Sequence, residues 1–389
     1  MAMTEEDAVT RLKNLKEGSS TASALLEGRP MPRREFLAGA GATAAAAFLG
    51  AGVAGASGAT PRTAMLGGTL DIYTWPDYFS AKNLSNFKKL TGTTINQSTY
   101  ESNDAMFAKL AATNGDSGFD MAIPTSGWIE VMVEKGMLQE IDHDKVPFKN
   151  VNPQLLNKSF DPGNKYSVPK DYGYDGVVYD PAVVTKPIKT WMDVLDAIKG
   201  QASGKSAYQI EYGTIAMGLW ALGYSMNDTD KAHLNEAADL MKTTAKHVKT
   251  FDGFDVTGMV SGELTLMVSD QSVARQVLLQ KPSFKFVVPG PHSELWVDNY
   301  TILTNAAHTA QAYAFVDFQL EPSSQVTDTE FIGYPTVLKN LPQLLPTSTK
   351  LRDVIFIPPA VYDTLETFIV RSDLEGYIED LANQVQAAA

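Results

Sequence analysis

Aromatic and acidic side chains occur together at the ends of several expected strands. Trp75, Asp77 and Tyr78 follow one strand within four residues, and Trp296 and Asp298 form the pattern Trp-Val-Asp in another. A buried ammonium requires a carboxylate partner, because an unpaired charge in the interior costs several kcal/mol. An aromatic face adds about 0.5 to 2 kcal/mol by cation–π attraction. These residue types therefore favour a site that binds an amine cation.

The same two residue types recur at other expected strand ends in both halves of the chain. The candidates are Trp75, Asp77, Tyr78, Glu211, Tyr212, Asp270, Trp296, Asp298 and Tyr334. Each of them taken alone is better explained by packing or by an exposed surface. Together they predict a cleft that encloses an amine.

Other chemistries lack the residues that they need. The chain has no cysteine, and its five histidines are scattered, with none three or four residues from another. No G-x-S-x-G nucleophile motif occurs. The stretch GQASGKS resembles a phosphate loop but has three residues between its glycines, where four are needed. We predict no enzyme, no catalytic residue and no cofactor, and the sequence indicates no metal site, although a site of carboxylates alone stays open.

Composition and net charge limit the classes of molecule that the protein is expected to bind. The chain has 389 residues, of which 44% are hydrophobic and 20% charged, so it is long enough to build two lobes with substantial cores. Its net charge of −13 repels nucleic acid and anionic lipid and attracts cations. We therefore expect a small cationic partner and no binding of nucleic acid.

The N-terminus has the three parts of an export signal. Arg33 and Arg34 precede Glu35, Phe36 and Leu37, and an Ala-rich and Gly-rich apolar run with small residues follows. The arginine pair predicts the twin-arginine pathway. A membrane anchor is the alternative, but Ala and Gly bury too little apolar surface to hold a helix in lipid. Residues 1–59 are thus predicted to be signal peptide and N-terminal extension, and the mature protein to be periplasmic.

Strands and helices alternate in the segment that must position the first candidates. Residues 69–75, 93–100 and 119–124 are expected strands, and Ser80 and Ser102 are expected N-caps of the helices between them. This alternation predicts a mostly parallel sheet with helices on both faces. Ligands of such sheets bind beyond the carboxyl ends of the strands, which is where the candidates lie.

The middle of the chain reads as a second unit of the same kind. Residues 166–180, which include Gly173 and Gly176, form a long extended segment suited to crossing between lobes, and residues 295–306 are long enough to cross back. From about residue 340 the chain is expected to be mainly helical. Helices are expected at residues 190–200, 214–225 and 234–248, and strands at residues 207–213, 263–270 and 284–290.

Several stretches resemble the periplasmic spermidine/putrescine-binding proteins of polyamine ABC importers. They include LDIYTWPDYF, STYESNDAMFAKL, GFDMAIPTSGWI, LWVDNYTILTNA and GYPT, in the family's order, from Leu70 to about Thr336. The resemblance implies the two-lobed type II periplasmic binding fold, an α/β fold in which each lobe is a mostly parallel sheet flanked by helices and the ligand binds between the lobes. It implies residues 69–174 and 297–341 in lobe 1, residues 175–296 in lobe 2, and residues 342–389 as a helical segment on lobe 2.

The resemblance also implies roles for single residues. Trp75 and Tyr78 match aromatic walls, and Asp77 matches an acidic position beside them. Thr125 matches a hydroxyl residue that faces the ligand. The last matches are Trp296 with a stacking tryptophan, Asp298 with an amine-binding aspartate and Tyr334 with a ligand-facing tyrosine.

The sequence departs from the family pattern at the other end of the ligand. Gly127 stands where the family commonly has a large polar residue, a space that Trp128 would partly fill. An acidic pair of lobe 2 aligns with Ile210 and Gly213, which leaves Glu211 as a shifted candidate, and Asp270 aligns with a family tryptophan. One amine end is therefore expected to be kept and the other rebuilt.

The resulting expectation is a monomeric solute-binding component of an ABC importer that delivers a polyamine-like cation to a membrane permease. A guanidino compound, an amino acid such as 4-aminobutyrate, a sensory role and an exported hydrolase are the alternatives. An amino acid is usually held by an arginine, and Arg275 is the one near an expected cleft segment, where we favour a structural ion pair for it.

Overall fold

The computed structural model describes residues 66–389 except 114–115, 202–203, 209–210 and 372. The predicted export signal lies outside the described residues. None of the described helices combines the length and the apolar character that crossing a membrane requires.

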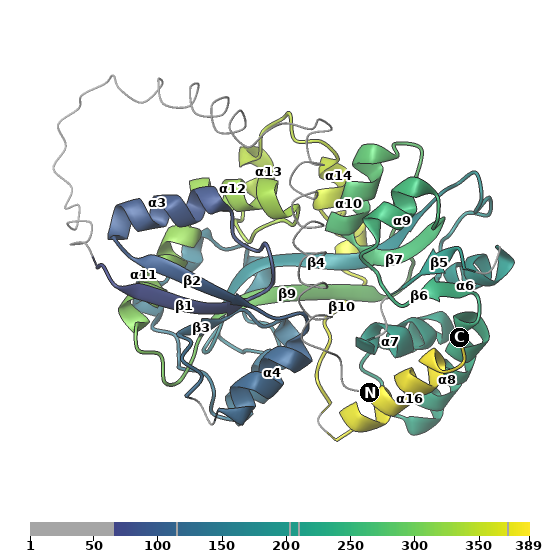
Figure 1. Ribbon diagram of the computed structural model, residues 1–389, viewed down its shortest axis with the longest axis horizontal. Helices are drawn as coiled ribbons and strands as arrows, with labels where there is room; N and C mark the ends of the chain where they lie inside the picture. Colours follow the sequence, from purple (N-terminus) through teal and green to yellow (C-terminus); the bar gives the residue numbers. More distant parts are fainter. Residues whose placement is uncertain (1–65, 114–115, 202–203, 209–210, 372) are drawn as a thin grey trace, which may run out of the picture. The chain divides into compact units, whose positions relative to one another are not determined.

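Helices and strands alternate along most of the described chain (Figure 1). The strands are β1 (Thr69–Thr74), β2 (Thr94–Thr99), β3 (Met121–Ala122), β4 (Val168–Tyr179), β5 (Ser206–Ala207), β6 (Val248–Thr250), β7 (Leu266–Asp270), β8 (Lys285–Val287), β9 (Ser293–Ile302) and β10 (Leu365–Glu366). The helices are α3 (Ala81–Thr91), α4 (Asn103–Ala112), α5 (Ile129–Glu134), α6 (Trp191–Gly200), α7 (Glu211–Leu222), α8 (Lys231–Ala245), α9 (Val256–Ser261), α10 (Gln271–Gln280), α11 (Thr309–Gln319), α12 (Pro322–Ile332), α13 (Leu341–Leu344), α14 (Arg352–Ile355), α15 (Pro359–Tyr362) and α16 (Glu375–Gln386).

The first helices begin where their capping residues predict. The Ser80 hydroxyl accepts a hydrogen bond from the backbone N–H of Asn83, and the Ser102 hydroxyl accepts one from Ala105. Gly92 ends α3 with a φ of +76°, a conformation that costs glycine little. These caps fix the lengths of the helices and thus the positions of the loops that follow β1 and β2.

The sheet is mixed, with the order β2-β1-β3-β9-β4-β7-β5-β6. β1 pairs in parallel with β2 and β3, and β5 pairs in parallel with β6 and β7. The long strands β4 and β9 are antiparallel to each other and run side by side (Figure 1). Two parallel groups are thus joined by an antiparallel pair, which is how the chain passes from one group to the other.

β4 pairs with a different partner along each half of its length. Its first half pairs with β9 up to Tyr174, and its second half pairs with β7 from Asp175 onward. Its glycines are sites of close approach, because a Cβ on Gly173 would lie 2.0 Å from the Trp296 ring and one on Gly176 would lie 2.5 Å from a backbone oxygen. This agrees with the extended segment predicted to cross between the lobes.

Two large apolar cores form on either side of this crossing. The core of lobe 1 includes Ile72, Phe87 and Phe315 from β1, α3 and α11. The core of lobe 2 includes Trp191 and Trp220 from α6 and α7, together with apolar residues of α8 and α16. The residues at which the chain passes between the lobes stay a prediction.

Some elements differ from those expected. Residues 207–213 were expected to be a strand, but β5 is only Ser206–Ala207 and α7 begins at Glu211. Short apolar runs do not distinguish a strand from a buried helix, and this run continues into the apolar helix α7. The strands β6 and β10 were not expected. In the C-terminal segment, α16 packs against α7 and α8.

Candidate functional site

The pairing of β4 with β9 places two carboxylates opposite each other. Asp171 is the register partner of Asp298, and both residues are buried. The Tyr78 hydroxyl lies 2.6 Å from Oδ1 of Asp171 and also contacts Oδ2 of Asp298. The Thr125 hydroxyl donates a hydrogen bond of 2.7 Å to Oδ1 of Asp298. We call these four residues the Asp298 cluster.

Two loops that follow strands carry the hydroxyl groups of this cluster. The chain turns after β1 through Asp77, whose φ of +52° lies in the left-handed region, and Tyr78 then points inward. Thr125 follows β3 and is held by Asn103, whose side chain donates to the Thr125 hydroxyl at 3.0 Å and accepts from its backbone N–H at 3.1 Å. The carboxyl ends of β1 and β3 therefore meet at this cluster, as parallel-strand topology requires.

Burial and a neighbouring charge change the acidity of the Asp298 cluster. Burial, followed by the charge of Asp171, raises the pKa of Asp298 from 3.8 to about 7. Burial also raises the pKa of the Tyr78 hydroxyl well above its usual value, with both carboxylates adding to the effect. The phenol is thus a proton donor, and Asp298 titrates close to neutral pH.

A second pair of carboxylates lies on the other flank of β4. Asp175 is the register partner of Asp270, the last residue of β7. Asp270 caps α10, accepting hydrogen bonds from the backbone N–H groups of Ser272 at 2.8 Å and Val273 at 2.9 Å. Burial followed by the charge of Asp270 raises the pKa of Asp175 from 3.8 to about 7.

Two aromatic side chains complete this second group. The Trp296 indole N–H donates to Asp175, and the Tyr334 hydroxyl donates to Asp270. The rings of Trp296 and Tyr334 meet edge to face, with centroids 4.7 Å apart and an angle of 88°. We call Asp175, Asp270, Trp296 and Tyr334 the Asp270 cluster.

The two clusters lie on one face of β4. Asp171 and Asp175 are four residues apart on a regular part of the strand, so their Cα atoms are about 13 Å apart and their side chains point to the same side. Gly173 lies between them, and the Trp296 ring covers it closely. Burial raises the pKa of the Tyr334 hydroxyl well above its usual value, with Asp270 and then the charges of Asp171 and Asp298 adding to the effect. The arrangement therefore has two acidic ends and aromatic rings between them.

Other predicted site residues lie outside these clusters. Asp77 is exposed. Trp75 is partly buried and packs against Tyr100, with ring centroids 4.6 Å apart. Glu211 is the first residue of α7 and not the end of a strand, and its side chain, like that of Tyr212, lies outside what the structure describes.

Sequence analysis missed Asp171 and Asp175. Both belong to the segment KDYGYDG, which was predicted only as a crossing strand. The available signal was two carboxylates at even spacing in a strand that is otherwise mostly apolar, because even spacing places both on one face. Their partners could not be identified without the register of β4.

Gly127 is explained by a contact that the sequence did not predict. A Cβ on this residue would lie 2.7 Å from the Phe368 ring and from the Phe368 carbonyl oxygen. Trp128 is buried and packs against Phe107 with ring centroids 5.2 Å apart. Phe368 therefore lies against Gly127, and the expectation that Trp128 partly fills the space there stays a prediction.

Two buried or half-buried arginines, Arg275 and Arg371, are engaged with backbone carbonyls. Arg275 is buried, and its Nε donates to the carbonyl oxygen of Lys350 at 3.1 Å. Arg371 donates from Nη1 to the carbonyl oxygens of Met226 and Asp228, each at 2.9 Å. These carbonyl contacts hold one nitrogen of each guanidinium group in the protein itself.

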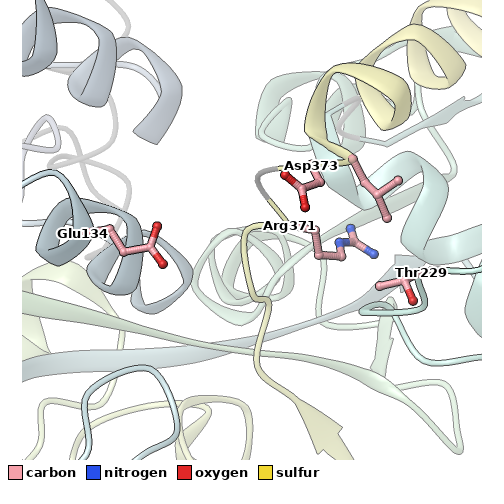
Figure 2. A pocket seen from close by; sticks show the side chains of 5 residues that line it. Glu134, Thr229, Arg371 and Asp373 are labelled. Carbon is pink, nitrogen blue, oxygen red and sulfur yellow. The ribbon is translucent and has the colours of Figure 1, made fainter.

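A surface pocket of about 480 Å³ shares no residue with the two clusters. Figure 2 shows Glu134, at the end of α5, opposite Arg371 and Asp373 from the segment before α16. Thr229 and Leu374 also line the pocket. Its single arginine is the one held by Met226 and Asp228, so this pocket is a poor site for an anion.

One histidine lies close to two carboxylates. Side-chain atoms of Asp71, Asp120 and His308 that could ligate a metal lie within 4.8 Å of one another. Asp120 accepts hydrogen bonds from the backbone N–H groups of Asp71 at 2.9 Å and His308 at 2.8 Å. These bonds give the Asp120 carboxylate a structural role at the start of α11.

Comparison with known proteins identifies the family. The family model described as bacterial extracellular solute-binding protein matches residues 82–353. The spermidine/putrescine-binding periplasmic protein of Escherichia coli strain K12 is 34% identical over 275 residues, which are 69% of this chain and 77% of that protein. The putrescine/agmatine-binding protein of Pseudomonas aeruginosa is 27% identical over 326 residues, 79% of this chain and 87% of that protein.

A solved structure supports the same assignment. The spermidine/putrescine ABC transporter substrate-binding protein of Streptococcus pneumoniae superposes with a TM-score of 0.72 at 30% identity, covering 82% of this chain and 99% of that chain. These relatives are substrate-binding proteins, and the E. coli protein is periplasmic. The chain belongs to the family of bacterial extracellular solute-binding proteins and has their two-lobed α/β fold.

Proposed function

We propose that the protein is the solute-binding component of an ABC importer and that its solute is a polyamine-like cation. The observation that carries this proposal is the pair of acidic clusters on one face of β4, centred on Asp298 and Asp270. Within the described residues, the ion pair of Lys170 with Asp171 is the only one that a lysine or arginine makes with a carboxylate of the two clusters. A cationic solute would therefore balance the other carboxylates when they are ionised.

An amine can supply this cation at each of the two acidic clusters. An ammonium that replaces the proton on Asp298 gains a charged partner already surrounded by the donors Tyr78 and Thr125. Asp175 and Asp270 offer the same acceptor chemistry at the other end. Burial strengthens these contacts, because water is excluded from them.

The aromatic pair supports a flexible apolar spacer between the two charges. Trp296 and Tyr334 present ring faces and edges between the acidic ends, and methylene groups pack well against such surfaces. A molecule with an amine at each end of a short alkyl chain combines both requirements. The names of the relatives, which bind spermidine, putrescine or agmatine, agree with this class.

A guanidino compound is the second candidate. A carboxylate accepts a guanidinium fork in bidentate fashion, and Asp298 and Asp175 each offer a carboxylate without a lysine or arginine partner among the described residues. An amino acid such as 4-aminobutyrate is less well supported, because Arg275 and Arg371 are held by carbonyl oxygens.

We propose that the two clusters are the ligand-binding residues. Tyr78, Thr125, Asp171 and Asp298 would bind one end of the solute. Asp175, Asp270, Trp296 and Tyr334 would bind the spacer and the other end. Trp75, Asp77 and Glu211 stay predicted ligand contacts from the family resemblance.

Transport follows from closure of the two lobes over the solute. Closure brings together groups from both lobes around the solute, and the protein then delivers the solute to a membrane permease. We further propose that residues 1–59 direct twin-arginine export to the periplasm, that the protein acts as a monomer, and that it performs binding without catalysis.

A thermal-shift screen tests the proposed function. The purified mature chain is heated with diamines, polyamines, guanidino compounds and amino acids, each in excess. A bound solute raises the melting temperature, because it binds the folded state alone. We expect diamines or polyamines to give the largest increase. A response to amino acids but to no amine would contradict the proposal.

A further inference from the structure

Lys170 is a buried lysine at an irregularity of β4. The register of β4 with β9 runs from the pair Pro169 and Asn299 directly to the pair Asp171 and Asp298, so Lys170 has no partner across the strand. It is the extra residue of a β-bulge, and bulges change the direction in which a side chain points. Lys170 is only 2% exposed.

The Lys170 side chain has the surroundings of a bound amine. Its Nζ forms an ion pair with Oδ2 of Asp171. The same nitrogen lies 3.5 Å from the centroid of the Tyr78 ring and 4.9 Å from that of the Phe79 ring. A carboxylate with two aromatic faces is how proteins hold an ammonium group.

This ammonium changes the charge of the Asp298 cluster. Lys170 neutralises Asp171, so the cluster carries one net negative charge when Asp298 is ionised. Without Lys170, the same end would carry two adjacent carboxylates. Asp328 is a further buried carboxylate; burial raises its pKa, and the charge of Lys170 lowers it. The number of positive charges that this end accepts is therefore set by a residue of the protein itself.

We propose that Lys170 is a specificity-determining residue that takes the place of one ammonium group of the solute. It leaves the Asp298 cluster with room for a single positive charge. The solute is therefore of the diamine class, or its counterpart with one guanidino end, and brings one cationic group to this cluster. Triamines such as spermidine, which carry two ammonium groups close together, bind less well. This inference rests on the proposed function.

A series of charge variants tests the inference by calorimetry with putrescine and spermidine. Lys170→Met keeps the length of the side chain and removes its charge, so it exposes the second carboxylate. We expect it to shift the ratio of affinities toward spermidine by about tenfold or more, because a nearby unit charge contributes that much inside a protein.

Removal of the carboxylate that pairs with Lys170 completes the series. Asp171→Asn leaves the Lys170 ammonium without its carboxylate, and we expect amine affinity to fall at least about tenfold. Adding Lys170→Met to Asp171→Asn removes the unpaired charge and should restore part of that loss. If Lys170→Met alone does not fold, as judged by circular dichroism, the amine affinities of Asp171→Asn and of the double variant are compared to test the role of Lys170.

Lys145→Met is the matched control. Lys145 forms an ion pair of 2.8 Å with Asp142 and lies 4.9 Å from the Tyr313 ring, but it is exposed and outside both clusters. Its removal should leave the affinity ratio unchanged. A folded Lys170→Met with the wild-type ratio, or a double variant no better than Asp171→Asn, would overturn the role of Lys170. A wild-type protein that binds neither amine would instead contradict the proposed function.

Discussion

Tyr78 has one phenolic proton and two carboxylates within reach of its hydroxyl. Asp171 has Lys170 as a partner, whereas Asp298 has the hydroxyl groups of Tyr78 and Thr125. Two ionised carboxylates around a single shared proton repel each other, so one of them holds a proton near neutral pH. The raised pKa of Asp298 makes it that residue, and in the proposed binding mode its proton is the one that a cationic solute displaces.

The pH dependence of binding follows from the direction of this shift. Because the pKa values of Asp298 and Asp175 are raised to about 7, both carboxyls are largely protonated at pH 5.5 and ionised at pH 8. An ammonium binds the ionised form, so the melting-temperature increase caused by putrescine should be larger at pH 8 than at pH 5.5.

The stability of the protein without solute should instead fall as pH rises. A carboxyl with a raised pKa binds more protons in the folded than in the unfolded state between pH 3.8 and about 7, so its contribution to stability is lost as pH rises through that range. Asp298→Asn should weaken this loss. Asp239→Asn is the control and should not weaken it, because Asp239 is exposed in α8 and lies outside both clusters. An equal melting-temperature increase with putrescine at pH 5.5 and at pH 8 would show that neither carboxyl must ionise for putrescine to bind.

At the scale of elements, the strand crossing was predictable and its register was not. The glycines of residues 166–180 and the length of residues 295–306 indicated two crossing strands, which are β4 and β9. The register of β4 with its neighbours, together with the bulge at Lys170, places Asp171 opposite Asp298 and Asp175 opposite Asp270. Both depend on contacts between distant segments, so local sequence patterns do not reveal them.

The loop after β3 offers a test of close packing between elements. Gly127 lies against Phe368, and a Cβ would come within 2.7 Å of a backbone oxygen that cannot move aside as a side chain does. Gly127→Ala should lower the free energy of unfolding by about 1 to 3 kcal/mol, as overpacking does. Chemical denaturation followed by circular dichroism measures the change.

Gly376→Ala is the control for this substitution. Gly376 lies in α16 with no atom within 4 Å of an added Cβ, and alanine favours the helix, so stability should stay equal or rise. If Gly127→Ala is as stable as the wild type, the segment around Phe368 does not pack there as closely as described.

At the scale of the whole molecule, the sequence predicted more of the fold than of the site. The alternation of strands and helices and the family motifs were enough to predict two lobes, and the comparison confirms that fold. Asp298, Thr125 and Tyr78 were candidates in the sequence and lie together in the structure, and their binding of a solute stays a prediction. Asp171, Asp175 and Lys170 join the candidate site only through the pairing and the bulge of β4.

Binding of an amine by Asp298 can be measured as the calorimetric affinity of putrescine for the wild type and for Asp298→Asn. The substitution keeps the size of the side chain and removes its charge. We expect the wild type to bind and the variant, folded as judged by circular dichroism, to lose most of the affinity, about 2 kcal/mol or more. Equal affinity of the two proteins would contradict the claim that this carboxylate binds the amine.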